Sequence, residues 1–167
     1  MNRRMMLASI AGFAMMAATA FAADDKPAVL FDIGGKFDKS FIAIFGLPGA
    51  FTWTCSGKHL PGYLAGYDKF KQHKVDELWC VAVNDGYVMA AWGRDQKADG
   101  KIRMLGDGNG LWTKALGLEV DSSAGGMGLR MRRCSMLVEN GIVKQLNVEA
   151  PGKFEVSDAD TLLKQLG

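Results

Sequence analysis

Three residues near position 50 have the types and the spacing of an activated thiol nucleophile. Pro48, Thr52 and Cys55 are arranged as P-x-x-x-T-x-x-C, where an apolar stretch gives way to a helix-like one. A thiol in the first turn of a helix faces unpaired backbone N–H groups and the positive end of the helix dipole, which both favour the thiolate. Pro48 can wall off the sulfur without an N–H, and the Thr52 hydroxyl can donate to a thiolate or accept from a bound hydroxyl. The pattern predicts nucleophilic sulfur chemistry.

This pattern resembles the active-site signature of the peroxiredoxins, and the longer string FGLPGAFTWTCSGKHLPGY (residues 45–63) resembles their type-five branch. The resemblance runs from about Phe41 to Gly167. It is carried by further motifs in order, which are Val83-Asn84-Asp85, Trp92-Gly93-Arg94, Gly100-Lys101-Ile102-Arg103, Arg133-Cys134-Ser135-Met136, Asn140-Gly141-Ile142-Val143-Lys144 and Leu146-Asn147-Val148-Glu149. It implies a thiol-dependent peroxidase that reduces hydrogen peroxide and alkyl hydroperoxides, with no bound cofactor and no metal.

The chain departs from the family pattern at three places. Trp53 stands where relatives usually have proline, and Cys134 where they usually have Phe or Tyr. The two strands that normally precede the first core strand look absent or shortened. The first departure bears on the shape of the pocket and on dimer contacts, and the last bears on the N-terminal edge of the fold.

The resemblance also implies the roles of the site residues. Cys55 would attack a peroxide oxygen and become a sulfenic acid. Arg133, Thr52 and the backbone N–H of Cys55 would hold the peroxide oxygens, while Pro48 shields the sulfur. A fixed cation beside the sulfur favours the thiolate and polarises the O–O bond.

A strand over residues 130–138 would decide which side chains accompany Arg133. Because side chains alternate along a strand, Arg133 is expected to share a face with Met131, Ser135 and Leu137, and Cys134 to lie on the opposite face.

Regeneration of the thiol depends on the other cysteines. The chain has 3 cysteines, an odd number, so at least one stays unpaired in a monomer. No cysteine follows Cys134, which closes a route in which a C-terminal cysteine pairs with the peroxidatic one. Cys80 lies 25 residues after Cys55, a spacing seen in relatives reduced by glutathione and glutaredoxin. Cys80 is therefore a candidate resolving cysteine; the alternative is an inert core thiol, since a bridge to Cys55 would require local unfolding. The expected reductant is glutathione with glutaredoxin, or another thiol.

The surrounding sequence predicts an α/β fold with elements in the order β-α-β-α-β-α-β-β-α. The expected elements are strands 40–46 and 75–83, a helix over 55–73 bent near Pro61-Gly62, a helix over 86–94 capped by Asn84-Asp85, a strand over 102–105, a short helix over 111–116, a glycine-rich loop over 122–128, a hairpin of strands 130–138 and 142–148 around Asn140-Gly141, and a final helix from Ser157 with Asp160 as its capping-box partner. The resemblance makes this a thioredoxin-like fold, a central mixed sheet flanked by helices with a C-terminal hairpin and helix.

The bulk composition fits one globular domain after a targeting segment. Residues 1–22 have a basic start, an uncharged apolar run and the small-x-small sequence Ala20-Phe21-Ala22, which predicts a cleaved signal peptide before a domain at 23–167. The mature chain would then be periplasmic or secreted, without stable membrane association. An uncleaved anchor, or a cytoplasmic or organellar chain, are the alternatives. Arg3 and Arg4 supply the whole formal charge of +2, so no basic face for nucleic acid is expected.

The sequence leaves two alternative functions to the peroxidase open. A thioredoxin-fold binding or redox-sensing module would keep the fold without turnover, whereas a disulfide oxidoreductase is disfavoured because the chain has no C-x-x-C. A homodimer is expected through surfaces near the active-site loop, where Trp53 lies. Of the 2 histidines, His59 and His73, His59 is expected mainly to pack and hydrogen-bond within its helix, and no zinc-ligand spacing is present.

Overall fold

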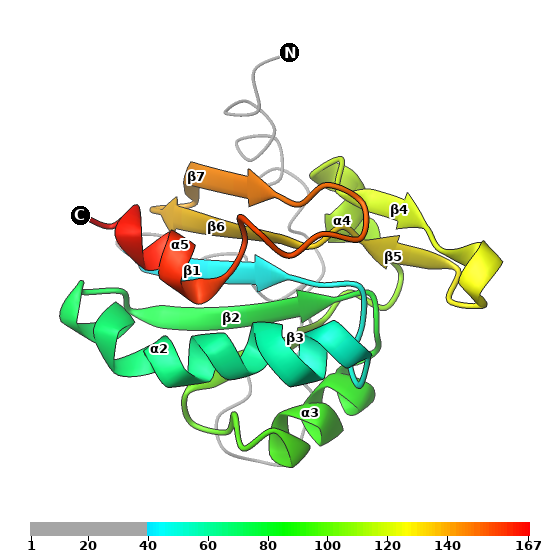
Figure 1. The fold of residues 1–167 in the computed structure, drawn as a ribbon, viewed down its shortest axis with the longest axis horizontal. Helices are drawn as coiled ribbons and strands as arrows, with labels where there is room; N and C mark the ends of the chain where they lie inside the picture. The colour runs from blue at the N-terminus through cyan, green and yellow to red at the C-terminus, as the bar shows by residue number, and fades with distance from the viewer. Residues whose placement is uncertain (1–39) are drawn as a thin grey trace.

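Residues 40–167, which the computed structural model describes, are built on a mixed five-stranded sheet (Figure 1). The strand order is β3-β2-β1-β6-β7. The strands are β1 (Phe41–Gly46), β2 (Glu77–Ala82), β3 (Ile102–Gly106), β6 (Cys134–Glu139) and β7 (Ile142–Val148). β1, β2 and β3 run parallel, and β6 runs antiparallel to β7, as the sequence predicts. The structure adds that β6 also pairs antiparallel with β1. The predicted signal segment and the shortened N-terminal edge lie outside the described residues.

The central strands are buried on both faces of the sheet. In β1, Ala43 and Phe45 belong to one hydrophobic cluster, while Ile42 and Ile44 belong to the other. The period-two alternation of a strand sends these pairs to opposite sides. This explains why β1 reads as a continuous apolar run in the sequence rather than as an alternating one.

Helices cover the two faces unequally. The face that includes Phe45 packs against α2 (Leu60–Gln72), α3 (Gly86–Asp95) and α5 (Ala159–Lys164), which lie in front of the sheet in Figure 1. The opposite face packs against Trp112 of the short helix α4 (Leu111–Ala115) and Leu116 just beyond it. The first face therefore carries the larger helical layer, and Cys55 lies in it.

The helix predicted over 55–73, with a bend near Pro61-Gly62, is two consecutive helical elements that meet between His59 and Leu60. Residues Cys55–His59 form a π-helical turn, in which the Leu60 N–H donates to the Cys55 carbonyl five residues earlier. α2 then begins at Leu60, with Pro61 in its first turn, where a missing N–H costs least. α3 begins as predicted, because the Asp85 carboxylate accepts from the Val88 N–H.

The C-terminal hairpin also follows the prediction. Asn140 and Gly141 both have positive φ, at 51° and 75°, as a two-residue hairpin turn of strands β6 and β7 requires. The final helix differs by one residue from the prediction: its N-cap is Asp158, whose carboxylate accepts from the Thr161 N–H. Ser157 is not the cap, because its hydroxyl donates to Glu149 instead.

The predicted strand over 130–138 is wrong as a single element. β5 (Leu129–Met131) pairs with β4 (Glu119–Asp121) in a separate two-stranded sheet, and β6 starts only at Cys134. A 3-10 turn, Ser123–Gly125, lies in the glycine-rich loop between β4 and β5. β4 is not predicted from the sequence, because it is a three-residue strand with no buried side chain.

Residues 40–167 contain neither a membrane-spanning helix nor a cluster of metal ligands. None of their helices has the length and apolar character needed to cross a membrane. Within the same range, no group of three or more His, Cys, Asp or Glu side chains is arranged to hold a metal ion.

Candidate active site

The loop over residues 47–54 leads from the end of β1 to Cys55 and is held by three anchors. The Leu47 N–H donates to the Val81 carbonyl, and the Ala50 N–H donates to Asn84 Oδ1 at 2.9 Å. Arg130 Nη1 reaches the carbonyl oxygens of Pro48 and Val83 at 3.5 and 3.3 Å. The loop is thus tied to β2, to the turn after β2 and to β5, which fixes the start of the helix that carries the cysteine.

Phe51 marks strain in this loop. Its φ of 59° lies in the left-handed region, which is unusual for a bulky residue and costs about 1–3 kcal/mol. Its side chain is 56% exposed, and its ring lies 6.4 Å from that of Trp92. Trp92 in turn donates from Nε1 to Ser56 Oγ at 3.0 Å, directly beside Cys55. α3 therefore braces both the loop and the first turn after it.

Cys55 and Arg133 meet across the molecule. The Cys55 side chain is fully buried, and Arg133 Nη2 donates to its Sγ at 3.4 Å. Arg133 lies immediately before β6, whose first residue pairs with Gly46 at the end of β1. The register of β1 and β6 thus delivers the guanidinium to the sulfur. A cation at this distance favours the thiolate, which is the nucleophilic form.

The faces of the segment around Arg133 are only partly as predicted. Ser135 is buried beside β7, and Leu137 belongs to the cluster that contains Cys55, while Cys134 lies on the opposite face. Met131, however, lies with Cys134 rather than with Arg133. The alternation fails there because β5 and β6 belong to separate sheets, and Arg132 and Arg133 lie in the connection between them rather than in one continuous strand.

His59 supports the guanidinium from its other side. Its Nδ1 lies 3.0 Å from Arg133 Nη1, and its Nε2 lies 3.1 Å from the Ser157 carbonyl oxygen. A carbonyl can only accept, so Nε2 carries the proton and the Nδ1 lone pair accepts from Arg133. Burial, and next the charge of Arg133, lower the pKa of His59 from 6.5 to about 3. His59 is therefore neutral at physiological pH.

The other two residues of the signature do not contact the sulfur through a hydrogen bond. The Thr52 hydroxyl donates to the Gly49 carbonyl at 2.8 Å, which leaves its lone pairs as acceptors. Pro48 is half-buried, and its carbonyl is the group that Arg130 approaches. Of the predicted residues, only Arg133 bonds to Cys55, whereas Pro48 and Thr52 belong to the loop that precedes it.

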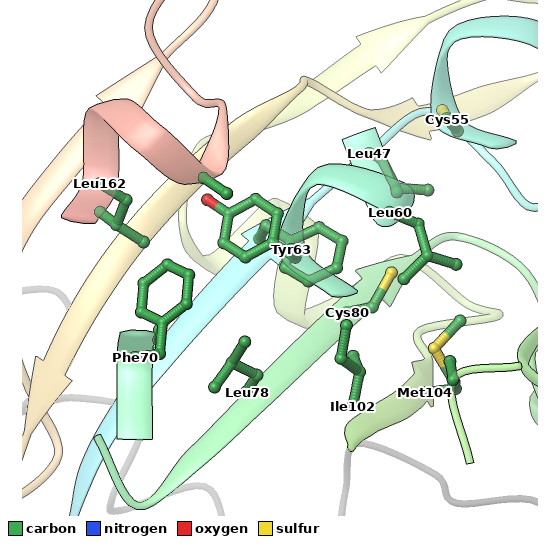
Figure 2. Packing of buried hydrophobic residues seen from close by; sticks show 14 of the residues in the cluster. Leu47, Cys55, Leu60, Tyr63, Phe70, Leu78, Cys80, Ile102, Met104 and Leu162 are labelled. Atoms are coloured by element: carbon green, nitrogen blue, oxygen red, sulfur yellow. The ribbon is translucent and has the colours of Figure 1, made fainter. Parts of the chain in front are cut away.

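Cys80 lies in the middle of β2, opposite Phe45 of β1 and Met104 of β3. In Figure 2 the side chains of Leu47 and Leu60 lie between Cys55 and Cys80. Burial, and next the charge of Cys55, raise the pKa of the Cys80 thiol well above its ordinary value. Burial also raises the pKa of Cys134 to about 12. All three cysteines are free thiols.

Several residues of the site were not identified from the sequence as parts of it. His59 could have been found, because it follows Cys55 by four residues and such pairs share one helix face. Asn84 and Arg130 hold the loop from a distance in sequence of 34 and 82 residues, and no local pattern marks them for this role.

Comparison with known proteins assigns the family. Residues 14–163 match the Redoxin family. Peroxiredoxin-2B of Arabidopsis thaliana is 44% identical over 125 residues, covering 75% of this chain and 77% of that protein. Hybrid peroxiredoxin hyPrx5 of Haemophilus influenzae is 47% identical over 133 residues, covering 78% of this chain and 55% of that protein.

A solved structure gives the same result for the fold. The crystal structure of reduced Prx3 of Vibrio vulnificus in complex with H2O2 is 43% identical, with a TM-score of 0.77, and the match covers 91% of this chain and 100% of that one. The sheet and helices described above are thus the thioredoxin-like fold of this family. The chain belongs to the peroxiredoxins, in their type-five-like branch, and is a thiol-dependent peroxidase.

Proposed function

We propose that Cys55 is the peroxidatic residue and that hydrogen peroxide and alkyl hydroperoxides are its substrates. The observation that carries this proposal is the 3.4 Å contact between Arg133 Nη2 and Cys55 Sγ. It supplies a cation both to the thiolate and to the charge that develops on a leaving oxygen. The Vibrio vulnificus relative, whose structure is a complex with H2O2, supports the substrate class.

The reaction is a two-electron oxidation of sulfur. The Cys55 thiolate attacks one peroxide oxygen, so that an S–O bond forms as the O–O bond breaks. The leaving oxygen takes the electron pair of the O–O bond and a proton from solvent, and departs as water or an alcohol. Arg133 stabilises the leaving charge, Thr52 accepts a hydrogen bond from the bound peroxide, and Pro48 limits access of water to the sulfur.

Regeneration of Cys55 is assigned to an external thiol, glutathione with glutaredoxin or a similar reductant. Its thiolate attacks the sulfenic sulfur, water leaves, and a second thiol releases Cys55 from the mixed disulfide. The burial of Cys80 within β2 and its raised pKa argue against its acting as the resolving thiol.

The test is mass spectrometry of the chain from Ala23 onward after one equivalent of hydrogen peroxide, with a sulfenic-acid trap and with Cys55→Ser as control. A trapped adduct on Cys55 that is absent from the variant is the expected result. A Cys55–Cys80 disulfide would contradict the external thiol. An unmodified Cys55 with peroxide remaining would contradict the peroxidatic role and favour a redox module without turnover.

A homodimer is proposed through the surface around the active-site loop. Trp53 is 91% exposed, Phe51 56% and Tyr87 75%, and large apolar side chains with such exposure favour an interface. Light scattering should give twice the chain mass for the wild type and the monomer mass for Trp53→Asp. Ile142→Asp, at an exposed apolar position on β7, should stay dimeric. A wild-type monomer would contradict the proposal.

Export is proposed from residues 1–22, with a periplasmic or secreted location for the mature chain. Their basic start and uncharged apolar run support a cleaved signal. N-terminal sequencing of the full chain expressed in a bacterial host should give Ala23 as the first residue. An intact Met1 in the cytosolic fraction would contradict export.

A further inference from the structure

The buried carboxylate of Glu149 lies outside the groups that touch the sulfur, yet it organises the segment behind them. Glu149 follows β7 directly and is only 4% exposed. Its Oε1 accepts four hydrogen bonds. The donors are the backbone N–H groups of Glu155, Val156 and Ser157, each at 2.8 Å, and the Ser157 hydroxyl at 2.9 Å. One carboxylate oxygen thus fixes the backbone of a three-residue segment.

The same segment presents one carbonyl to the active site. The Ser157 carbonyl oxygen accepts from His59 Nε2 at 3.1 Å and from the Tyr63 hydroxyl at 2.9 Å. His59 Nδ1 accepts from Arg133, whose other Nη contacts Cys55. The contacts therefore form an unbroken chain from the Glu149 carboxylate to the sulfur.

The main chain of Glu149 also bonds directly to the main chain of Arg133. The Glu149 N–H donates to the Arg133 carbonyl at 2.9 Å, and the Glu149 carbonyl accepts from Arg132 Nη2 at 3.2 Å. The ring of Phe154, in the loop that precedes the anchored segment, lies 5.6 Å from the Arg133 guanidinium carbon and 5.0 Å from the His59 ring. Glu149 therefore holds the main chain of Arg133 by a direct hydrogen bond, and it fixes the segment next to Phe154, which contacts the Arg133 side chain.

The charge state of Glu149 suits this role. Burial disfavours its ionisation, but the hydrogen bonds from the amides of residues 155–157 outweigh burial and lower its pKa. It is ionised at neutral pH and accepts stronger hydrogen bonds than a neutral amide would.

We propose that Glu149 is a positioning residue for the peroxidase reaction, which acts through Ser157 and His59 to orient the Arg133 guanidinium toward Cys55. The inference rests on the proposed roles of Cys55 and Arg133. A guanidinium held from one side by a fixed acceptor loses little orientational freedom when peroxide binds, and misplacement of such a group is costly in rate.

The test compares Glu149→Gln, Arg133→Gln and the double variant. Glu149→Gln should lower the second-order rate constant for hydrogen peroxide on the order of 10-fold. In the Arg133→Gln background the same change should cost less than about 2-fold, because a residue that acts through Arg133 has nothing left to orient. The pH profile of Cys55 alkylation by iodoacetamide should move to higher pH in Glu149→Gln. Glu155→Gln changes an exposed carboxylate in the same segment and should leave both readouts unchanged.

The outcomes separate this inference from the proposed function. If Arg133→Gln itself leaves the rate unchanged, the role of Arg133 is wrong. If Arg133→Gln slows the reaction but Glu149→Gln does not, or slows it equally in both backgrounds, the positioning role of Glu149 is wrong. A lower melting temperature with an unchanged alkylation profile would mean that Glu149 is structural only. If Glu149→Gln does not fold, Glu149→Asp keeps the charge but shortens the reach, and the same comparison decides.

Discussion

Arg133 Nη1 donates to His59 Nδ1 at 3.0 Å, so a neutral imidazole holds the cation that contacts the reactive sulfur. The two residues come from distant parts of the chain, the turn after Cys55 and the residue before β6. A protonated imidazole could not accept this bond and would repel the guanidinium. The low pKa of His59 is therefore part of the arrangement that presents Arg133.

Two substitutions of His59 separate its two contacts. Asparagine places an oxygen near the position of Nδ1 and keeps an acceptor for Arg133, whereas glutamine places a polar group near Nε2 and keeps a donor for Ser157. We expect His59→Asn to retain more peroxide reactivity than His59→Gln, with a ratio on the order of 10-fold, because the bond to Arg133 is nearer to the chemistry. Stopped-flow measurement of the second-order rate constant decides, and equal rates would contradict the orienting role of Nδ1.

The lowered pKa of His59 should also make the free energy of unfolding depend on pH. Its pKa is 6.5 ordinarily and about 3 in the fold, so below pH 6.5 the unfolded chain binds a proton that the folded chain does not. The free energy of unfolding should therefore fall by about 1.2 kcal/mol for each unit by which the pH decreases from 6 to 4.5. Glu149 and Asp158, whose pKa values are also lowered, begin to add to this loss about one pH unit above their ordinary values of 4.5 and 3.8.

Urea titrations across this pH range measure that slope. The slope should be largely absent in His59→Asn, which does not titrate. His73→Asn, at an exposed histidine, should retain it. An unchanged slope in His59→Asn would show that another group is responsible.

Most of the secondary structure around the site can be predicted from the sequence, but β4 cannot. Local sequence patterns predict three of these features. Burial on both faces makes strands β1 and β2 continuous apolar runs. The positive φ of the hairpin turn selects Asn140 and Gly141, and the start of α3 selects a capping side chain, Asp85. β4 leaves no such pattern, since its three side chains are exposed and only pairing with β5 makes it a strand.

The site itself divides in the same way. Pro48, Thr52 and Cys55 are close together in the chain, so their pattern can be recognised in the sequence. The contacts of Arg133 with Cys55 and His59 depend on the register of β1 and β6, and on the break between β5 and β6 that strand alternation cannot foresee. The anchoring of Ser157 by Glu149 depends on a loop conformation with no motif.

Gly106 predicts a steric limit next to the site. A Cβ there would lie 2.6 Å from Gly86 N and 2.8 Å from the Asn84 carbonyl oxygen, both rigid backbone at the start of α3. Gly106→Ala should lower the free energy of unfolding by about 1–3 kcal/mol. Because Asn84 also anchors the active-site loop, peroxide reactivity should fall as well.

Gly62→Ala is the matched control for this substitution. Gly62 lies within α2, and the nearest atom to an added Cβ is Ala159 Cβ at 3.9 Å. It should gain about 0.5–1 kcal/mol from helix propensity. Equal stability of the two variants in thermal and urea unfolding would contradict the steric argument.

Cys80→Ser tests whether the protein needs a second cysteine for turnover. Cys80 is fully buried between β1 and β3, and its raised pKa keeps it as the poorly nucleophilic thiol. Turnover of hydrogen peroxide with glutathione and glutaredoxin should therefore stay within about 2-fold of the wild type, since each cycle would use external thiols only. Cys134→Ser, at a buried cysteine on the opposite face of the sheet from Cys55, reports the cost of a hydroxyl in the core. If Cys80→Ser stops turnover after one oxidation of Cys55 while Cys134→Ser continues, β2 must open during the cycle and Cys80 must be the resolving residue.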